Sequence, residues 1–88
     1  MIAITKLAGN FVETDIDLEI VLMRLDTGEL LSLADTAAAA WRLIDGRRDR
    51  AAVVAALQSE YSAGEQEILA HVGEWLEEMK DAGLIAEE

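Results

Sequence analysis

The sequence predicts an α+β fold in which a three-stranded antiparallel sheet is followed by three helices, giving a winged-helix-like shape. Up to residue 33, short apolar runs alternate with turn residues, as is typical of strands. Beyond residue 36, apolar residues recur at three- and four-residue spacings, which indicates helices. The chain has 88 residues and no proline-rich or low-complexity linker, so we expect one domain covering residues 1–88.

The strand half begins weakly and ends in a hairpin. Residues 1–6 alternate weakly and form either a lead-in or the edge of a first strand, and Asn10–Thr14 is expected to be a short strand. Glu19–Leu25 is the strongest candidate because it is rich in β-branched and apolar residues. A tight turn containing Gly28 then returns the chain, so that Leu30–Leu33 pairs with the preceding strand.

The first helix is predicted to start at the break that follows Leu33. Asp35 or Thr36 can cap it by accepting a hydrogen bond from a free backbone N–H. Gly46 ends the helix because glycine adopts the left-handed conformation without steric cost. The spacing predicts one buried face, made of Ala37, Ala40, Trp41 and Ile44.

The second helix is predicted to begin after Asp49, which is its expected N-cap. Ser62 and Glu65 fit a capping box, in which each side chain satisfies a backbone donor of the other residue. This pattern places a helix boundary at Ser62. The buried face of the second helix is predicted to be Val53, Val54, Leu57 and Tyr61.

The third helix is predicted over about residues 64–82. Gly83 ends it, and Leu84 folds back onto Met79 as in a Schellman motif. Gly73 lies in its interior, where it either permits a close contact or is simply tolerated. Leu84 and Ile85 close the core, and residues 86–88 are expected to trail into solvent. One apolar stripe is expected, made of Ile68, Leu69, Val72, Trp75, Leu76 and Met79.

The charge balance excludes several classes of partner. Eighteen acidic residues against seven basic ones give a net charge of −11, which disfavours nucleic acid and anionic membranes as partners. A basic or neutral peptide is the more natural partner. The chain contains no cysteine, and we find no signal peptide and no apolar run of membrane-spanning length. We therefore expect a soluble cytoplasmic protein.

Residues for catalysis or metal binding are sparse. His71 is the one histidine, and Glu67 and Glu74 share its helix face, so zinc binding is conceivable. A surface histidine beside carboxylates is the better interpretation. The acids Asp15, Asp17 and Asp26 lack the spacing of a calcium loop and are expected to be solvated turn residues. We expect no enzymatic activity, no metal and no cofactor.

Several motifs together resemble the PqqD family. They are the run LSLADTAAAAWRLIDG at residues 31–46, the segment Val53–Tyr61, and VGEWLEEM at residues 72–79 followed by Gly83–Ile85. Their order and spacing extend the resemblance over about residues 21–85. The sequence departs from the family pattern at Ala34, where asparagine is usual, and at His71, where aspartate is usual.

The resemblance implies a RiPP recognition element, a peptide chaperone that binds the leader of a ribosomally made precursor peptide. In such domains the leader adds as a strand beside the third strand and its side chains enter a groove against the third helix. The implied partners are the precursor peptide and a modifying enzyme, such as a radical SAM enzyme, a protease or a cyclase. The pathway is pyrroloquinoline quinone biosynthesis, lasso-peptide biosynthesis or a related one, and the departures favour a pathway other than the quinone one.

The sequence supplies the parts that this mode of binding needs. The last strand of a hairpin-ordered sheet lies at an edge with unpaired N–H and C=O groups. On the third helix, apolar residues are expected to line one wall, and charged residues that favour Lys or Arg in the leader are expected on its rim. The candidate peptide-binding residues are Leu30, Leu31, Ser32, Leu33, Glu67, Ile68, His71, Val72, Trp75 and Met79, with Glu74 and Glu78 also on the rim.

Core packing is the competing interpretation for the same side chains. We assign Trp41, Leu57, Leu69 and Leu76 to the core, whereas groove and core remain equally open for Leu31, Ser32, His71 and Trp75. Two other functions also remain open. One is a winged-helix transcriptional regulator, although the third helix is acidic where that motif presents donors to DNA. The other is a dimerisation module that joins two copies through the exposed strand edge.

Overall fold

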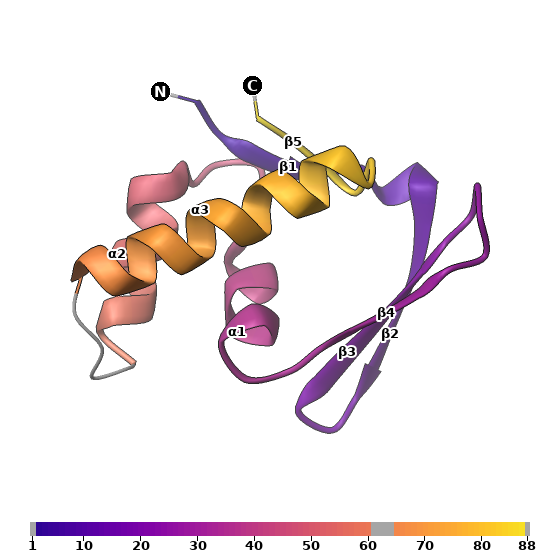
Figure 1. Ribbon diagram of the computed structural model, residues 1–88, viewed down its shortest axis with the longest axis horizontal. Coiled ribbons are helices and arrows are strands. Elements are labelled where there is room, and N and C mark those ends of the chain that lie inside the picture. Colours follow the sequence, from indigo (N-terminus) through magenta and orange to yellow (C-terminus); the bar gives the residue numbers. More distant parts are fainter. Residues whose placement is uncertain (1, 61–64, 88) are drawn as a thin grey trace.

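The computed structural model describes residues 2–60 and 65–87, without the side chains of Glu65 and Gln66. Figure 1 shows a sheet on one side of the molecule and helices on the other, with both chain ends close together. The elements in chain order are β1 (Ile4–Lys6), a 3₁₀ turn (Ala8–Asn10), β2 (Phe11–Ile16), β3 (Glu19–Arg24), β4 (Leu30–Leu33), α1 (Asp35–Leu43), α2 (Arg50–Gln58), α3 (Glu65–Asp81) and β5 (Ile85–Glu87).

The predicted fold class is confirmed. Strands β2, β3 and β4 form an antiparallel sheet in that order, and three helices follow them. The hairpin between β3 and β4 has the predicted turn, in which Gly28 has a φ of +74°. The strand predicted at Asn10–Thr14 begins one residue later and continues to Ile16, because six residues of β2 pair with β3.

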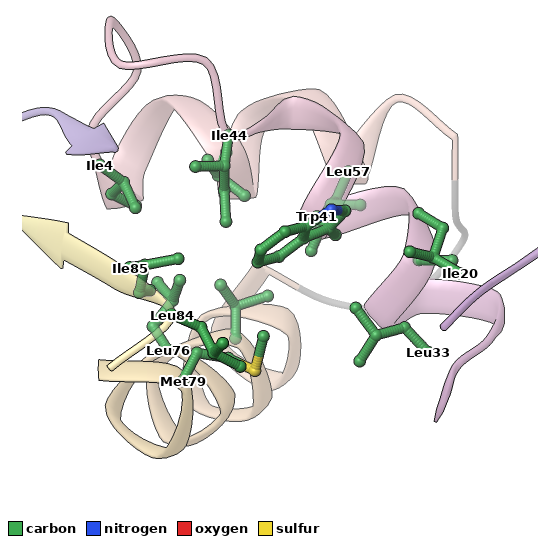
Figure 2. Packing of buried hydrophobic residues seen from close by; sticks show 14 of the residues in the cluster. Ile4, Ile20, Leu33, Trp41, Ile44, Leu57, Leu76, Met79, Leu84 and Ile85 are labelled. Atoms are coloured by element: carbon green, nitrogen blue, oxygen red, sulfur yellow. The ribbon is translucent and has the colours of Figure 1, made fainter. Parts of the chain in front are cut away.

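Trp41 lies at the centre of the core, as the helix periodicity predicts (Figure 2). Its side chain is fully buried, and its ring lies 5.3 Å from that of Phe11 in an edge-to-face arrangement. The indole Nε1–H donates to Glu13 Oε1 at 3.0 Å, so its polar group is satisfied. Lys6 Nζ lies 4.6 Å from the centre of the ring, and burial lowers the pKa of this lysine.

The start of α1 differs from the prediction. Ala34 occupies the N-cap position and no side chain caps the helix, so the assignment of Asp35 or Thr36 as the cap was wrong. Asp35 instead has a φ of +52°, which turns the chain from strand to helix and leaves its side chain exposed. α1 ends at Leu43, three residues before the predicted stop at Gly46, because the chain becomes extended at Ile44. Ile44 is nevertheless buried, as predicted.

The predicted start of α2 and the predicted end of α3 are confirmed, whereas α2 ends at Gln58, before the predicted boundary at Ser62. Asp49 caps α2 by accepting a hydrogen bond from the Ala52 N–H at 2.9 Å. At the end of α3, the N–H of Leu84 donates to Met79 O and that of Gly83 to Lys80 O, each at 3.0 Å, as a Schellman motif requires. The predicted roles of Tyr61 and Ser62 fall outside the described residues.

The apolar stripe of α3 is narrower than predicted. Leu69 was assigned to the core, but 49% of its surface is exposed. It follows Ile68 by one residue, a rotation of about 100° around the helix, and so points away from the stripe. The buried residues of the stripe are Ile68, Val72, Leu76 and Met79, at spacings of four, four and three.

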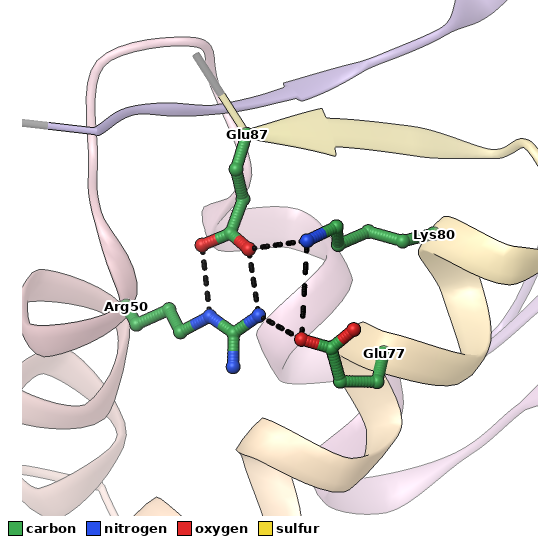
Figure 3. Close-up of polar contacts among 4 residues, drawn as sticks. All are labelled: Arg50, Glu77, Lys80 and Glu87. Carbon is green, nitrogen blue, oxygen red and sulfur yellow. Dashed lines mark hydrogen bonds and ion pairs between the residues drawn. The ribbon is translucent and has the colours of Figure 1, made fainter.

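The chain end was also predicted wrongly, because Ala86 and Glu87 belong to a strand with the buried Ile85 instead of trailing into solvent. β5 pairs antiparallel with β1, and Glu87 lies within a cluster of charges (Figure 3). Arg50 donates to both carboxylate oxygens of Glu87, from Nε at 2.8 Å and from Nη2 at 2.6 Å. Lys80 Nζ adds a contact of 3.0 Å, and Glu77 accepts from Arg50 at 2.7 Å. The cluster joins β5 to α2 and α3.

Acid is expected to weaken the attachment of β5. The hydrogen bonds from Arg50, followed by that from Lys80, hold the pKa of Glu87 at about 2, below its ordinary value of 4.5. The ionised carboxylate therefore stabilises the fold above pH 4.5, and this contribution is lost as the pH falls from 4.5 toward 2. After allowance for the partly exposed partners, we expect a loss of roughly 1–2 kcal/mol in the free energy of unfolding.

Urea unfolding at pH 7 and pH 3 measures this loss. The Glu87→Gln variant should lose most of the pH dependence of unfolding free energy that Glu87 contributes. Glu78→Gln, which removes an exposed carboxylate, should keep it. Equal pH dependence in wild type and Glu87→Gln would show that the cluster does not contribute to acid sensitivity.

Gly73 is tolerated in α3 and is not required by a close contact. A Cβ at this position would meet only Arg50 Nη1, at an ordinary 3.8 Å. Gly73→Ala should therefore stabilise the protein by about 0.5–1 kcal/mol and raise Tm by roughly 3–6 °C. Gly83→Ala is the matched control and should lower Tm, because Gly83 has a φ of +76°. A decrease for Gly73→Ala in thermal melts followed by circular dichroism would contradict this account.

Candidate functional site

The outer edge of β4 is open to a further strand. In the described part of the chain, β4 pairs only with β3. The N–H of Arg24 donates to the C=O of Glu29, its opposite residue, at 2.9 Å. Hydrogen-bonded and non-hydrogen-bonded pairs alternate along an antiparallel ladder, so this bond identifies which residues of β4 direct their backbone groups toward β3. Leu31 and Leu33 therefore direct their N–H and C=O groups toward β3. Those of Leu30 and Ser32 point to the free edge, where an extended peptide can pair with them.

A pocket lies next to this edge, between α1 and α3. Its volume is about 180 Å³. The lining is almost entirely apolar. Among its described residues, His71 is the one with a titratable side chain. A cavity of about 150 Å³ can hold benzene, so this pocket has room for one large apolar side chain. The lining residues are Thr36, Ala37, Ala40, His71, Val72 and Trp75.

The four strand residues predicted for the site divide by face. Leu31 and Leu33 point toward the helices, where Leu33 is buried and Leu31 packs partly buried against the core. Leu30 and Ser32 are exposed on the other face of the sheet. The strand thus offers two backbone positions at its edge, while its inward side chains belong to the core.

The α3 residues predicted for the site divide between the pocket and the core. His71, Val72 and Trp75 line the pocket together. Ile68 and Met79 are buried in the core and are not part of the lining, because α1, α2 and β5 pack against α3. Glu67 is exposed one turn before His71, on the pocket side of the helix by its spacing.

Sequence reasoning missed the contribution of α1. Thr36, Ala37 and Ala40 form the wall of the pocket that faces α3. Their small side chains carry no chemical signal, and the periodicity marks Ala37 and Ala40 only as core positions. The usable signal is their place directly after the edge strand, since a helix that starts there must border any peptide added to that strand.

The surroundings of the pocket are acidic. Every ion pair among the described residues involves Arg24, Arg42, Arg48, Arg50 or Lys80, and each of these pairs lies outside the pocket lining. Glu67, Glu74 and Glu78 on α3 and Asp35 at the start of α1 are exposed and have no basic partner within 4.0 Å in the described part of the chain. A basic peptide therefore suits this surface better than an acidic one.

The described residues also bear on three other classes of ligand, namely metal ions, membranes and DNA. Within residues 2–60 and 65–87, no three His, Asp or Glu side chains gather closely enough to hold a metal ion. The same described residues include no helix that is both long and apolar enough to cross a membrane. The exposed face of α3 carries carboxylates, which would repel a DNA backbone.

The comparison with protein families decides the relationship. The family described as "Coenzyme PQQ synthesis protein D (PqqD)" matches residues 19–85, which is most of the chain. The chain belongs to the PqqD family. The matched region starts at β3 and includes β4, all three helices and the first residue of β5, so it contains the free edge and the pocket.

The fold of this PqqD-family chain also matches a solved structure, described as TbiB1 in complex with the TbiA(beta) leader peptide. The TM-score is 0.82 with 25% sequence identity, and the match covers 92% of this chain and 94% of the TbiB1 chain. A search of curated proteins gave no match. The fold likeness therefore covers more of the chain than the family match does.

Proposed function

We propose that this protein binds the leader of a ribosomally made precursor peptide by strand addition to β4 and presents the peptide to a modifying enzyme. The observation that carries this proposal is the free edge of Leu30 and Ser32 beside an apolar pocket of about 180 Å³. Membership of the PqqD family supports it, as does the likeness to TbiB1, which was solved with a leader peptide.

Binding divides into a backbone part and a side-chain part. The N–H and C=O groups of Leu30 and Ser32 pair with the peptide backbone, which gives affinity without reading the sequence. Because alternate residues of a strand point to opposite faces, every second peptide residue faces α1 and α3. One of these residues enters the pocket between Ala37, Ala40 and Trp75, and this contact selects an apolar side chain.

The role that we propose is non-catalytic. The pocket offers apolar contacts and one histidine, whereas general acid–base or nucleophilic catalysis needs paired groups held around a reacting atom. The chemistry would then belong to a second partner, a peptide-modifying enzyme such as a radical SAM enzyme, a protease or a cyclase. We further propose that the protein works in the cytoplasm, where ribosomally made precursors arise.

Chemical-shift mapping tests the proposal. The ¹⁵N-labelled protein is titrated with the leader of the precursor peptide encoded beside its gene. We expect perturbed amides at Leu30–Leu33, at Ala37 and Ala40, and around His71 and Trp75. No binding, or perturbations centred on Arg47–Arg50, would contradict the proposal. Shifts at Leu30–Leu33 that depend on protein concentration without peptide would instead indicate dimerisation through the strand edge.

A further inference from the structure

The outer face of the sheet, which the helices leave uncovered, carries a row of apolar side chains. The register places Val12 opposite Met23 and Met23 opposite Leu30, so the row crosses all three strands. The exposed fractions of the three residues are 47%, 37% and 66%, the largest belonging to the residue at the free edge. Single exposed apolar residues are ordinary, but a continuous row that ends at an open edge indicates a contact surface.

The neighbouring row ends in a polar position. Thr14 lies opposite Val21, and Val21 lies opposite Ser32. The Ser32 hydroxyl donates to Glu19 Oε2 at 3.3 Å, so the Glu19 carboxylate reaches across from β3 to the edge strand. Glu19 has no basic partner within 4.0 Å among the described residues. Its negative charge is therefore available to a group placed beyond Ser32.

Strand addition brings peptide side chains to both rows. Residues directly opposite each other in a sheet point to the same face, whether the strands run parallel or antiparallel. The peptide residues opposite Leu30 and Ser32 therefore point to the outer face, away from the pocket. These two residues are two positions apart in the peptide. One of them continues the apolar row, and the other lies within reach of Glu19.

We propose, on the basis of the proposed function, that the leader is read on this outer face as well as in the pocket. The residue opposite Leu30 is apolar and bulky, because it extends the row that Val12, Met23 and Leu30 form. The residue opposite Ser32 is Lys or Arg, because it meets the Glu19 carboxylate. The net charge of −11 and the acids beside the pocket favour the same basic peptide. The preferred leader thus carries one apolar and one basic residue on its outer-facing side, and an apolar residue on the side that enters the pocket.

Peptide selection with a charge swap tests this inference. A phage-displayed library of random twelve-residue peptides is selected in parallel on the wild-type protein and on Glu19→Lys, Asp81→Lys and Leu30→Thr. Synthetic copies of the selected peptides are then tested on Ser32→Pro, and those that no longer bind are taken as edge binders. Asp81→Lys is the matched control, because it makes the same change of charge on α3, outside β3 and β4.

Wild type and Asp81→Lys should select edge binders with Lys or Arg two positions from a bulky apolar residue. Glu19→Lys should select Asp or Glu at the basic position, and it should bind the wild-type peptides at least fivefold more weakly. Leu30→Thr should lose the apolar preference. Edge binders without these preferences, or with a basic preference that survives in Glu19→Lys, would overturn the inference and leave the proposed function intact. No edge binders at all would overturn both.

Discussion

Ser32→Pro is expected to weaken binding of the leader by roughly ten- to a hundredfold while leaving the protein folded. The Ser32 N–H points to the free edge, so proline removes a donor that the peptide needs and places its ring in the path of the added strand. Each lost hydrogen bond contributes about 0.5–1.5 kcal/mol, and the steric conflict adds to this loss. The fold should persist, because proline is accepted in edge strands where the N–H faces solvent.

Isothermal titration of the purified variant with the leader measures the change in Kd. The matched control is Asp15→Pro on β2, the opposite edge of the same sheet. The ladder alternation directs the Asp15 N–H to solvent, and the Asp15 side chain makes one exposed ion pair with Arg42. This variant should bind the leader as wild type does. Equal loss in both variants, or none in Ser32→Pro, would contradict binding at the β4 edge.

Trp41→Ala is expected to cost about 3–5 kcal/mol of unfolding free energy. A chain of this size has a total stability of roughly 4–13 kcal/mol, so the variant should be close to unfolding. The reason is the position of Trp41, which is fully buried, packs against the ring of Phe11 and donates its N–H to Glu13. Removal leaves a cavity where α1 meets the sheet.

Trp75→Ala is the natural control, because the protein has two tryptophans with different surroundings. Trp75 is partly buried and lines the pocket, so its loss should cost less stability and more peptide affinity. Urea unfolding followed by circular dichroism gives both stabilities without relying on tryptophan fluorescence. If Trp75→Ala were the more destabilising change, the two tryptophans would have been assigned to the wrong roles.

Local pattern was enough to predict the hairpin, the start of α2 and the end of α3. The β-branched run of β3, the turn at Gly28 and the Schellman motif at Gly83 all depend on neighbours close in sequence. The pairing of β1 with β5 joins segments about 80 residues apart, each only three residues long. Such short strands have no detectable period. The bonds between Arg50 and Glu87 span 37 residues, so the sequence around one residue gives no indication that it pairs with the other.

Only part of the candidate site could be expected from the sequence, because the packing of one helix on another joins residues that are far apart in the chain. The free edge follows from strand order, whereas the expectation that α3 borders the peptide came from the resemblance to the PqqD family. A single stripe, however, cannot separate Val72 and Trp75, which line the pocket, from Ile68 and Met79, which the core covers. That distinction depends on where α1 crosses α3. The opposite wall is made of alanine and threonine side chains, whose small size creates the space without any chemical signature.

The pairing of β1 with β5 also bears on protein engineering. Ile4 lies opposite Glu87, so the first and last strands lie side by side and the two ends of the described chain leave from the same region of the molecule (Figure 1). A reporter or an enzyme fused to either end would begin at the same corner of the molecule. Figure 1 places that corner away from β4, so neither fusion would obstruct the added strand. N-terminal and C-terminal fusions are thus geometrically equivalent, and a linker of one length serves both.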